Sequence, residues 1–493
     1  MRNYKRYTVV LIALIMLLTV FNVNSFAADA QTTADSVYLQ SVRDLIEQKY
    51  NGDIDVTALN KASTIPEMFD TLDDFSTFYD QKQFDSLMEN FGGSIEGIGI
   101  QVEQEDKDKY ITILNVYPDS PARKAGVLSG DKIAEVNGKS VAGQAMEDVI
   151  SKVKGPAGTT VKLGLIRQGS KDIVTLEMPR ASIVIPSVHY EIRGNIGYIL
   201  IDQFTDNTYS GVNEALSLFD SKKITRVVLD LRNNPGGLVD QAVKVAQRFV
   251  PKGLITKLDY KDPSEPDMPY YSNLPELKYK LAVLVNENSA SASEILTGAI
   301  KDTNAGTVVG NKTYGKAKVQ SFFPILKSES FVRLNQNKQT KSVNAYDFPF
   351  AMDSDLIGWG KMTIGLYYTP NGDCIDLKGI EPDEKVVEDM SGDSIPVNLL
   401  QPMSVTVKPG VGTQYMDVLY AESVLKLLKY NVDEPDFTLD QKTFAAIKKF
   451  QKDSKVYSYG VLDFTTQKLL NEKLSDLKQT QDPVYVKAVS LIK

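Results

Sequence analysis

The sequence predicts a multidomain α/β protein. Its 493 residues suffice for about three to four domains, and a composition of 42% hydrophobic and 24% charged residues is typical of folded domains. In the middle of the chain, two buried-strand patterns are each followed by a turn and a helical pattern. Short strand patterns precede them, and helical patterns lie at both ends. We therefore expect a mixed α/β core with smaller domains before and after it.

The composition excludes several kinds of site. His189 is the only histidine and Cys374 the only cysteine, so a His-rich zinc site, a CxxC site and an intrachain disulfide cannot form. A Ser-His-Asp triad could use only His189, which we expect to be a surface or packing residue. We expect Cys374 to be an ordinary thiol. The formal net charge of −8 argues against a general nucleic-acid binder.

Residues 1–27 have the pattern of an export signal peptide. Arg2, Lys5 and Arg6 form a basic start, an apolar run covers residues 8–21, and residues 25–27 (SFA) form a small-x-small cleavage pattern. The apolar run is short for a bilayer span, which needs ~20 residues. The alternative is an uncleaved membrane anchor. In both cases we expect the rest of the chain to work outside the cytoplasm, at the cell envelope or cell wall, without depending on disulfides.

Residues 28–90 read as helical. Apolar residues recur at helical spacing between Val37 and Ile46, and an aromatic-rich pattern continues from Phe69 to Phe84. We expect this segment to serve packing or oligomerisation, for example in a homodimer.

Residues 91–180 read as short strands with one helix. Residues 111–113 and 161–165 are strand-like, and residues 145–153 are a helix candidate. The glycines of residues 97–100 (GIGI) let amide N–H groups point one way and form an anion-binding nest. A peptide's C-terminal carboxylate can sit in such a nest while its backbone adds to a strand edge. A dinucleotide-binding loop is excluded because Val102 stands where its third glycine would be.

The third region, residues 181–395, contains the two strand–turn–helix patterns. Residues 227–231 lead through a turn into a helical pattern at 239–249, and residues 281–285 lead through a serine-rich turn into a helix ending near residue 300. A serine at a helix N-terminus is well placed to act as a nucleophile, because the free N–H groups favour negative charge there. Plain N-capping is the alternative.

Five motifs in this region resemble those of the carboxyl-terminal processing protease (tail-specific protease) family. They are residues 230–238 (DLRNNPGGL), 289–293 (SASAS), 313–320 (TYGKAKVQ), 367–372 (YYTPNG) and 378–383 (KGIEPD). Residues 97–133 resemble the PDZ domain of that family, and residues 72–78 resemble its LDDPYS segment with Phe75 in place of proline. The resemblance implies a PDZ domain inserted before a ClpP/crotonase-like α/β serine protease core.

The resemblance also implies a set of functional residues. The nucleophile would be Ser291 and the base Lys316, with Gln320 orienting the lysine; the oxyanion hole would use the backbone N–H groups of Gly237 and Ala292. No cofactor and no metal are implied. The residues that would bind a peptide in the PDZ domain are Gly97, Ile98, Gly99, Ile100 and Ile150.

The chemistry of the chain agrees with a lysine base. Serine is a weak nucleophile until a base takes its proton, and Ser-Lys pairs are a known alternative to histidine. The pKa of the lysine must fall from ~10.4 toward 7–8, which burial in an apolar site achieves. This chain departs from the family at Asn288 and Ala317, where glycine is usual, and at Lys318, where a small polar residue is usual. Lys318 would either lower the pKa of Lys316 by repulsion or be mistaken for the base.

The C-terminal region resembles a peptidoglycan-binding module. Residues 443–451 (TFAAIKKFQ) resemble its TxxAVKxFQ helix, and residues 459–466 (YGVLDFTT) resemble its DGxVGxxT turn, with Asp463 in place of the second glycine. A three-helix packing domain without a ligand is the alternative. Residues 327–360 are longer than expected between motifs and are interpreted as a surface insertion, with a substrate-contacting lid as the alternative. The resulting division is signal peptide 1–27, helical segment 28–90, PDZ domain 91–180, Ser-Lys protease core 181–395, linker 396–414, peptidoglycan-binding-like domain 415–475 and C-terminal tail 476–493.

Together these observations predict an exported serine endopeptidase. It would recognise protein substrates with exposed C-termini through the PDZ domain, cleave them through an acyl-enzyme, and bind peptidoglycan but no nucleic acid. The alternatives are a non-catalytic PDZ adaptor and a cell-wall-binding scaffold. On this interpretation, deleting residues 415–493 removes wall binding and leaves peptidase activity intact.

Overall fold

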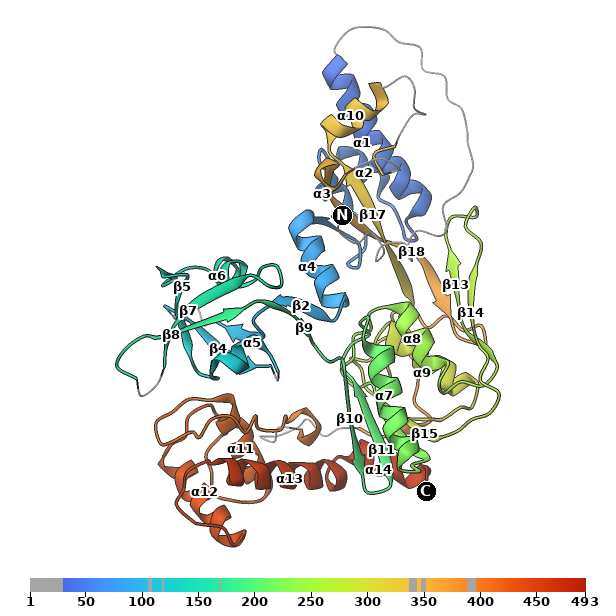
Figure 1. Cartoon of the computed structure of the whole chain (residues 1–493). Helices are drawn as coiled ribbons and strands as arrows, with labels where there is room; N and C mark the ends of the chain where they lie inside the picture. Colours follow the sequence, from blue (N-terminus) through green and yellow to red (C-terminus); the bar gives the residue numbers. More distant parts are fainter. Residues whose placement is uncertain are drawn as a thin grey trace.

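The computed structural model describes residues 30–104, 109–117, 119–167, 170–336, 344–346, 352–387 and 396–493. Figure 1 shows a central α/β region, a helical region above it, a small β-rich domain to one side and a helical module below that domain. The expected signal peptide lies outside the described residues. Within them, no helix combines the length and the apolar character needed to cross a membrane.

The central region is built on a six-stranded sheet with the order β10-β11-β12-β15-β16-β19. β10 and β11 are antiparallel, and the other neighbours are parallel. Its inner strands are continuous apolar runs because both faces of the sheet are covered. The strands are β10 (Val188–Arg193), β11 (Ile196–Ile201), β12 (Arg226–Asp230), β15 (Lys280–Val285), β16 (Thr307–Gly310) and β19 (Glu384–Lys385).

Helices cover both faces of this sheet. α7 (Thr208–Ser221), α8 (Val239–Ala246) and α9 (Ala292–Asp302) share one core with alternate strand residues such as Val227 and Leu229. The residue between these two, Val228, belongs instead to a core on the opposite face. This alternation follows from the two-residue period of a strand.

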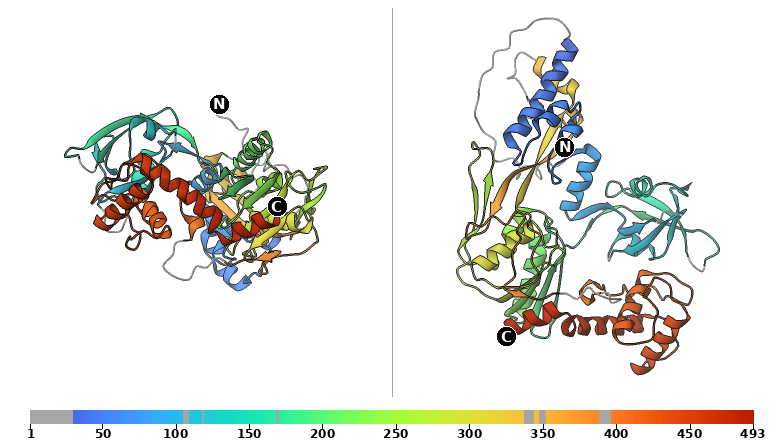
Figure 2. Two further views of the ribbon diagram at one scale, coloured as in Figure 1. Left: turned by 90° about the horizontal axis from the view of Figure 1, so that it is seen from below. Right: turned by 180° about the vertical axis from the view of Figure 1, so that it is seen from behind.

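The opposite face is covered by the C-terminus of the chain, which corrects one expectation. Residues 476–493 were expected to be a tail, but they contain the last turn of α13 (Phe464–Thr480) and the whole of α14 (Pro483–Leu491). α14 lies against the sheet, as the red helix beside the C label shows in both views of Figure 2. The helix docks there because Val484, Tyr485 and Ala488 cover apolar strand residues of this face.

A second sheet extends away from the first and carries the N-terminal helices. Its order is β1-β18-β13-β14, with β17 also paired to β18. The predicted helical segment packs on it and shares a core with the hairpin of β17 and β18. Its elements are α1 (Ala30–Lys49), α2 (Val56–Lys61), α3 (Ile65–Phe69), β1 (Thr77–Asp80), α4 (Gln81–Phe91), β13 (Gly253–Tyr260), β14 (Met268–Ser272), β17 (Lys318–Leu326), α10 (Ser328–Gln336), the short turn η2 (Asp353–Asp355) and β18 (Leu356–Tyr368).

The described part of residues 327–360 belongs to this second core. Phe331 of α10 packs on Tyr38 of α1, with ring centroids 5.5 Å apart. Trp359 of β18 stacks on Phe84 of α4 at 4.1 Å. The segment therefore covers the apolar face of the N-terminal helices within the same chain.

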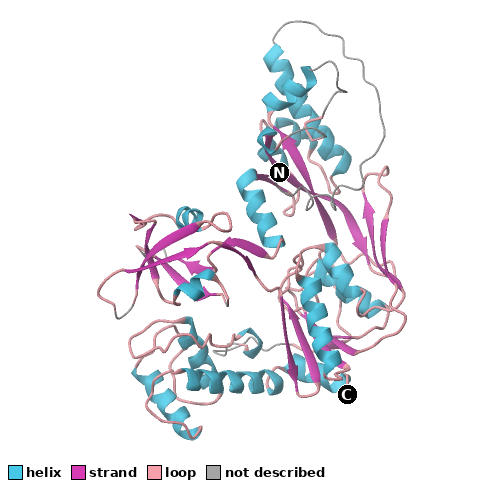
Figure 3. Cartoon of the chain, in the orientation of Figure 1, coloured by secondary structure: helices cyan, strands magenta, loops and turns pink. Residues whose placement is uncertain are grey.

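The β-rich domain has the strand order β3-β4-β5-β7-β8, with β6 paired to β5, and Figure 3 shows how few helices it contains. The ribbon of β2 and β9 joins it to the central region. Asn207 holds both connecting strands, because its amide donates to the carbonyls of Gly93 (3.1 Å) and Ile185 (2.9 Å). The elements are β2 (Ser94–Gly97), β3 (Ile100–Glu103), β4 (Ile111–Val116), α5 (Pro121–Ala125), β5 (Lys132–Val136), β6 (Lys139–Ser140), α6 (Met146–Val153), β7 (Thr160–Ile166), β8 (Val174–Pro179) and β9 (Ala181–Val184).

The C-terminal module consists of α11 (Met416–Leu427), α12 (Gln441–Asp453) and α13 around one core. The described part of the expected linker also belongs to it, because Val397 of η3 (Val397–Leu399), Leu400 and Met403 are buried against these helices. The module touches the β-rich domain at Gly130, where a Cβ atom would lie 2.7 Å from the ring of Tyr415.

Candidate active site

The predicted nucleophile lies in a strained turn between β15 and α9. Ser291 has φ of 57° and ψ of −116°, a sparsely populated conformation that costs about 1 kcal/mol or more. The other two serines of the motif are buried and structural. Ser289 donates to the Leu231 carbonyl at 2.8 Å, and Ser293 donates to the Asn234 carbonyl at 3.0 Å. Ser291 is half-buried, and within the described chain its hydroxyl donates to no acceptor.

A buried carboxylate holds this turn against the segment of the predicted base. Oε2 of Glu294 accepts the backbone N–H groups of Ser291 and Lys316, both at 2.9 Å. Oε1 accepts the Thr313 hydroxyl at 2.6 Å and the Gly315 N–H at 2.7 Å. Burial raises the pKa of Glu294, and the four hydrogen bonds oppose that rise.

A buried phenol makes a second link between the same two segments. The hydroxyl of Tyr367, on β18, lies 2.8 Å from the Lys316 carbonyl and 3.1 Å from the Ser291 carbonyl. Tyr367 is 2% exposed. Ser291 and Lys316 are thus tied together through their backbones, although among the described residues no hydrogen bond joins their side chains.

The environment of Lys316 favours the neutral amine. Burial, followed by the positive charge of Lys361, lowers the pKa of Lys316 to about 8, although Asp73 and Glu294 act in the opposite direction. The ammonium lies 4.3 Å from the centre of the Phe75 ring. The aromatic residue that replaces the family's proline therefore packs directly on the predicted base.

Lys318 has a different environment and a different charge state. Its ammonium pairs with the Asp73 carboxylate at 3.0 Å. Burial lowers the pKa of Lys318, but the hydrogen bond and charge of Asp73 outweigh it and raise the pKa overall. Lys318 therefore stays protonated, and Lys316 is the lysine suited to act as a base.

The predicted oxyanion donors lie beside this turn. Neither the Gly237 N–H nor the Ala292 N–H has a hydrogen-bond partner in the described part of the chain. Gly236 packs directly against the nucleophile turn, because a Cβ atom there would lie 2.8 Å from Cβ of Ser291 and 3.0 Å from the Ala292 nitrogen. At Gly237, a Cβ atom would lie 2.1 Å from the Phe204 carbonyl oxygen, so only glycine fits.

Gln320 lies on the same strand as Lys318 but is bonded elsewhere. Its amide donates to the Thr363 hydroxyl at 3.3 Å, and that hydroxyl contacts Asp73. The structure shows no hydrogen bond between Gln320 and Lys316, both described residues. Its orienting role stays a prediction.

Comparisons with known proteins identify the family. The profile of peptidase family S41 matches residues 195–386, and a PDZ domain profile matches residues 112–167. A probable CtpA-like serine protease of Staphylococcus haemolyticus is 33% identical over 423 residues, which are 85% of this chain and 77% of that protein. The chain belongs to the CtpA-like proteases of peptidase family S41. A probable CtpA-like serine protease of Staphylococcus aureus strain N315 is 30% identical over 457 residues, covering 92% of this chain and 84% of that protein.

Among solved structures, this S41 peptidase is similar to a photosystem II D1 C-terminal processing protease. The identity is 23%, the coverage is 73% of this chain and 95% of that chain, and the TM-score is 0.40. The PDZ domain of a carboxy-terminal protease from Vibrio cholerae, solved with a peptide, is 31% identical over 18% of this chain and 97% of that chain, with a TM-score of 0.17. The expected family, the multidomain α/β fold and the serine-type peptidase are confirmed by the family matches.

In the PDZ domain, the predicted peptide-binding residues divide into two groups. Ile98 is buried in the domain core, where its carbonyl accepts the Ala122 N–H at 2.9 Å, whereas Ile100 and Ile150 are half-buried. Gly99 has φ of +81°, and a Cβ atom there would lie 2.4 Å from Ser120. Gly97 pairs with Ala181 at the end of the connecting ribbon. Binding of a peptide by these residues stays a prediction.

His189 and Cys374 both lie outside this site. His189 is exposed on β10 and pairs with Asp202 at 2.8 Å, and this hydrogen bond raises the pKa of His189. Cys374 is a half-buried free thiol that packs against the central core. Sequence reasoning missed Glu294, Tyr367 and Asp73, although all three lie within or next to the quoted motifs.

Proposed function

We propose that this CtpA-like protease is an exported endopeptidase in which Ser291 attacks the peptide bond and Lys316 is the general base. The observation that carries the proposal is the pairing of a strained, half-buried serine with a lysine whose pKa lies near 8, both tied to Glu294. The S41 family membership supports the reaction class.

In the proposed reaction, neutral Lys316 takes the proton of Ser291 as its oxygen attacks the scissile carbonyl. The resulting oxyanion accepts hydrogen bonds from the free N–H groups of Gly237 and Ala292, each worth about 3–4 kcal/mol. The Lys316 ammonium then protonates the leaving amine, and an acyl-enzyme remains on Ser291. Water, activated by Lys316, hydrolyses the ester and restores the serine. The side chains come into contact when substrate fills the site, because catalytic hydrogen bonds tighten in the complex.

The PDZ domain is proposed to select substrates by their C-terminal carboxylates. The glycine-rich entry to β3 supplies backbone N–H groups, and the strand edge supplies main-chain pairing. Half-buried Ile100 and Ile150 are placed to contact an apolar side chain of the peptide.

Export and wall attachment complete the proposal. Residues 1–27 support export, and residues 443–466 support a peptidoglycan-binding module. In that module, Tyr457 is 83% exposed and lies 5.3 Å from the Tyr459 ring, which gives an aromatic surface for stacking on a sugar. Sedimentation with isolated cell wall tests this part, and a Tyr457→Ala, Tyr459→Ala chain that sediments as well as wild type would contradict it.

The peptidase itself is tested by hydrolysis of an unfolded protein such as β-casein. Wild type should cleave it, Ser291→Ala should not, and Ser293→Ala should retain activity in its folded fraction because Ser293 only supports the loop. Cleavage by Ser291→Ala at the wild-type rate would reject the assignment.

The PDZ proposal predicts a preference for free C-termini. A peptide substrate with a C-terminal carboxylate should be cleaved with a KM several-fold below that of the same peptide amidated at its C-terminus. The reason is that the amide lacks the charge held by the nest. Equal KM values for the two peptides would contradict this role.

Lys361 should tune the pH dependence of the reaction. Its positive charge lowers the pKa of Lys316, so Lys361→Gln should raise that pKa and increase the protonated, inactive fraction of Lys316 at neutral pH. The acid limb of kcat/KM should move to higher pH, with a loss of roughly two- to fivefold at pH 7 and recovery above pH 9. Lys378→Gln, on an exposed turn, is the control. An unmoved acid limb in Lys361→Gln would contradict the prediction.

A further inference from the structure

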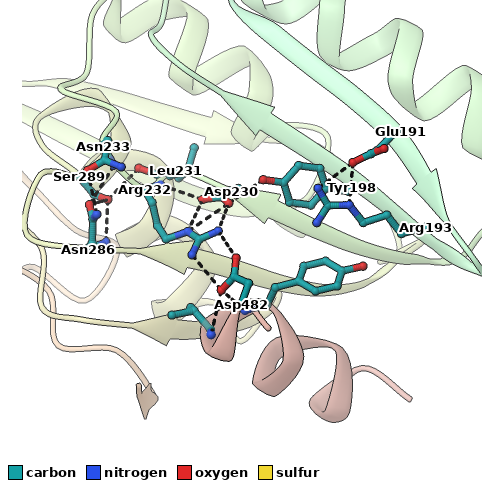
Figure 4. A network of polar contacts seen from close by, with 12 residues as sticks. Glu191, Arg193, Tyr198, Asp230, Leu231, Arg232, Asn233, Asn286, Ser289 and Asp482 are labelled. Atoms are coloured by element: carbon teal, nitrogen blue, oxygen red, sulfur yellow. Dashed lines mark hydrogen bonds and ion pairs between the residues drawn. The ribbon is translucent and has the colours of Figure 1, made fainter. Parts of the chain in front are cut away.

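The last helix of the chain is joined to the loop of the active site by a buried ion pair. Arg232 lies in the DLRNNPGGL motif, and Asp482 lies one residue before α14. Two parallel contacts join them, at 3.1 and 2.8 Å, in a bidentate arrangement. Their side chains are only 3% and 4% exposed. Figure 4 shows the pair between the helix and the sheet.

The same guanidinium also binds a second carboxylate. Arg232 contacts Asp230 through Nε at 3.0 Å and through a terminal nitrogen at 2.6 Å, and Asp230 accepts the Tyr198 hydroxyl at 2.7 Å. Burial alone would raise the pKa of Asp230, but the charge of Arg232 and the hydrogen bonds from Arg232 and Tyr198 together lower that pKa. The single positive charge of Arg232 is therefore shared between two buried carboxylates, which hold the guanidinium from two sides.

From Arg232, a short path of hydrogen bonds leads to the nucleophile turn. The carbonyl of the preceding residue, Leu231, accepts a hydrogen bond from the Ser289 hydroxyl. The following residue, Asn233, donates its N–H to Asn286 at 2.9 Å. The Asn234 carbonyl accepts the Ala290 N–H at 3.0 Å. The loop that Arg232 anchors therefore contacts the turn on both sides of Ser289 and continues into Gly236 and Gly237.

Asp482 is fixed from the helix side as well. Its carboxylate caps α14 by accepting the N–H groups of Val484 and Tyr485, both at 3.1 Å. The Arg193 guanidinium lies between two aromatic rings. It is 4.7 Å from the centre of the Tyr485 ring on α14 and 3.6 Å from the centre of the Tyr198 ring on β11. The docking of α14 against the sheet therefore fixes the position of the Asp482 carboxylate.

We propose that Asp482 is a positioning residue of the active site, which aligns the Gly236–Gly237 loop through Arg232 and makes α14 part of the peptidase. This inference rests on the proposed function. It follows that the C-terminal module cannot be removed with α14 without loss of activity. On this inference, deletion of residues 415–493 should remove peptidase activity as well as wall binding, contrary to the separation expected from the sequence. Because only two residues, Gln481 and Asp482, separate α13 from α14, the module is also joined to the site through this helix.

The test is Asp482→Asn in the full chain. Asparagine still caps a helix but carries no charge, so the capping of α14 is retained and the ion pair is lost. We expect kcat to fall about tenfold with KM unchanged, because a misplaced loop affects the transition state. Labelling of Ser291 by a fluorophosphonate should slow in parallel. The control is Lys487→Gln, which removes the exposed pair of α14 with Glu384 (3.0 Å) and should stay within about twofold of wild type.

The outcomes separate the inference from the proposed function. Unchanged kcat and labelling in folded Asp482→Asn, with an active wild type, would overturn the inference alone. A wild type that neither cleaves nor is labelled would count against the proposed function and the inference together. If Asp482→Asn does not fold, Arg232→Lys decides, because it keeps the buried charge and loses the bidentate fork. That variant should show the same loss of kcat, and wild-type kcat would overturn the inference.

Discussion

Lys316→Ala should reduce kcat by roughly 10³-fold at every pH, since a general base contributes about 10²–10⁴. Lys318→Ala should behave differently. It frees the Asp73 carboxylate, whose charge raises the pKa of Lys316, so activity should fall at pH 7 and recover as pH rises. The measurement is kcat against pH from 6.5 to 9.5 for both variants and wild type.

This comparison distinguishes the two lysines without relying on a single loss of activity. Recovery of Lys316→Ala at high pH would show that Lys316 is not the base. A loss in Lys318→Ala that does not recover at high pH would assign the role to Lys318 and contradict the charge state inferred from its pairing with Asp73.

Glu294→Ala should destabilise the protein by about 3 kcal/mol or more, because it leaves the buried N–H groups of Ser291, Gly315 and Lys316 and the Thr313 hydroxyl without an acceptor. Glu294→Gln should also lose activity. Its amide nitrogen cannot accept hydrogen bonds, so one pair of donors remains unsatisfied. The measurements are the urea midpoint and the specific activity of the folded fraction.

The matched control is Glu287→Gln, on the exposed side of the same turn, where the carboxylate contacts only Asn311 at 3.1 Å among the described residues. It should keep wild-type stability within about 0.5 kcal/mol. Wild-type activity in folded Glu294→Gln would show that this carboxylate does not hold the turn in the geometry needed for catalysis.

The elements that the sequence predicted well are those whose pattern reflects burial on both sides. β12 and β15 were predicted from continuous apolar runs, and α9 from the serine-rich turn before it. The types and positions of Ser291 and Lys316 followed from motif resemblance. Their placement on either side of one carboxylate did not, because glutamate is almost never fully buried, whereas Glu294 is.

The C-terminus shows why the long-range contacts could not be predicted from the sequence. Val484, Tyr485 and Ala488 form a short apolar stripe, and nothing in its local pattern indicates that its partner is a sheet face formed some 250 residues earlier. The same holds for Asp73, whose pairing with Lys318 depends on a contact between the N-terminal segment and β17. Long-range pairing of this kind is set by tertiary packing and not by local propensity.

The most direct test of the Ser291–Lys316 pair is the site and pH dependence of covalent labelling. The chain without residues 1–27 should be treated with a fluorophosphonate between pH 6 and 10, and the modified residue located by peptide mass spectrometry. The dyad predicts an adduct on Ser291 alone, formed at a rate that rises through about pH 8, with Lys316→Ala labelled far more slowly at every pH. An adduct on Ser289 or Ser293, or labelling of Lys316→Ala at the wild-type rate, would contradict it.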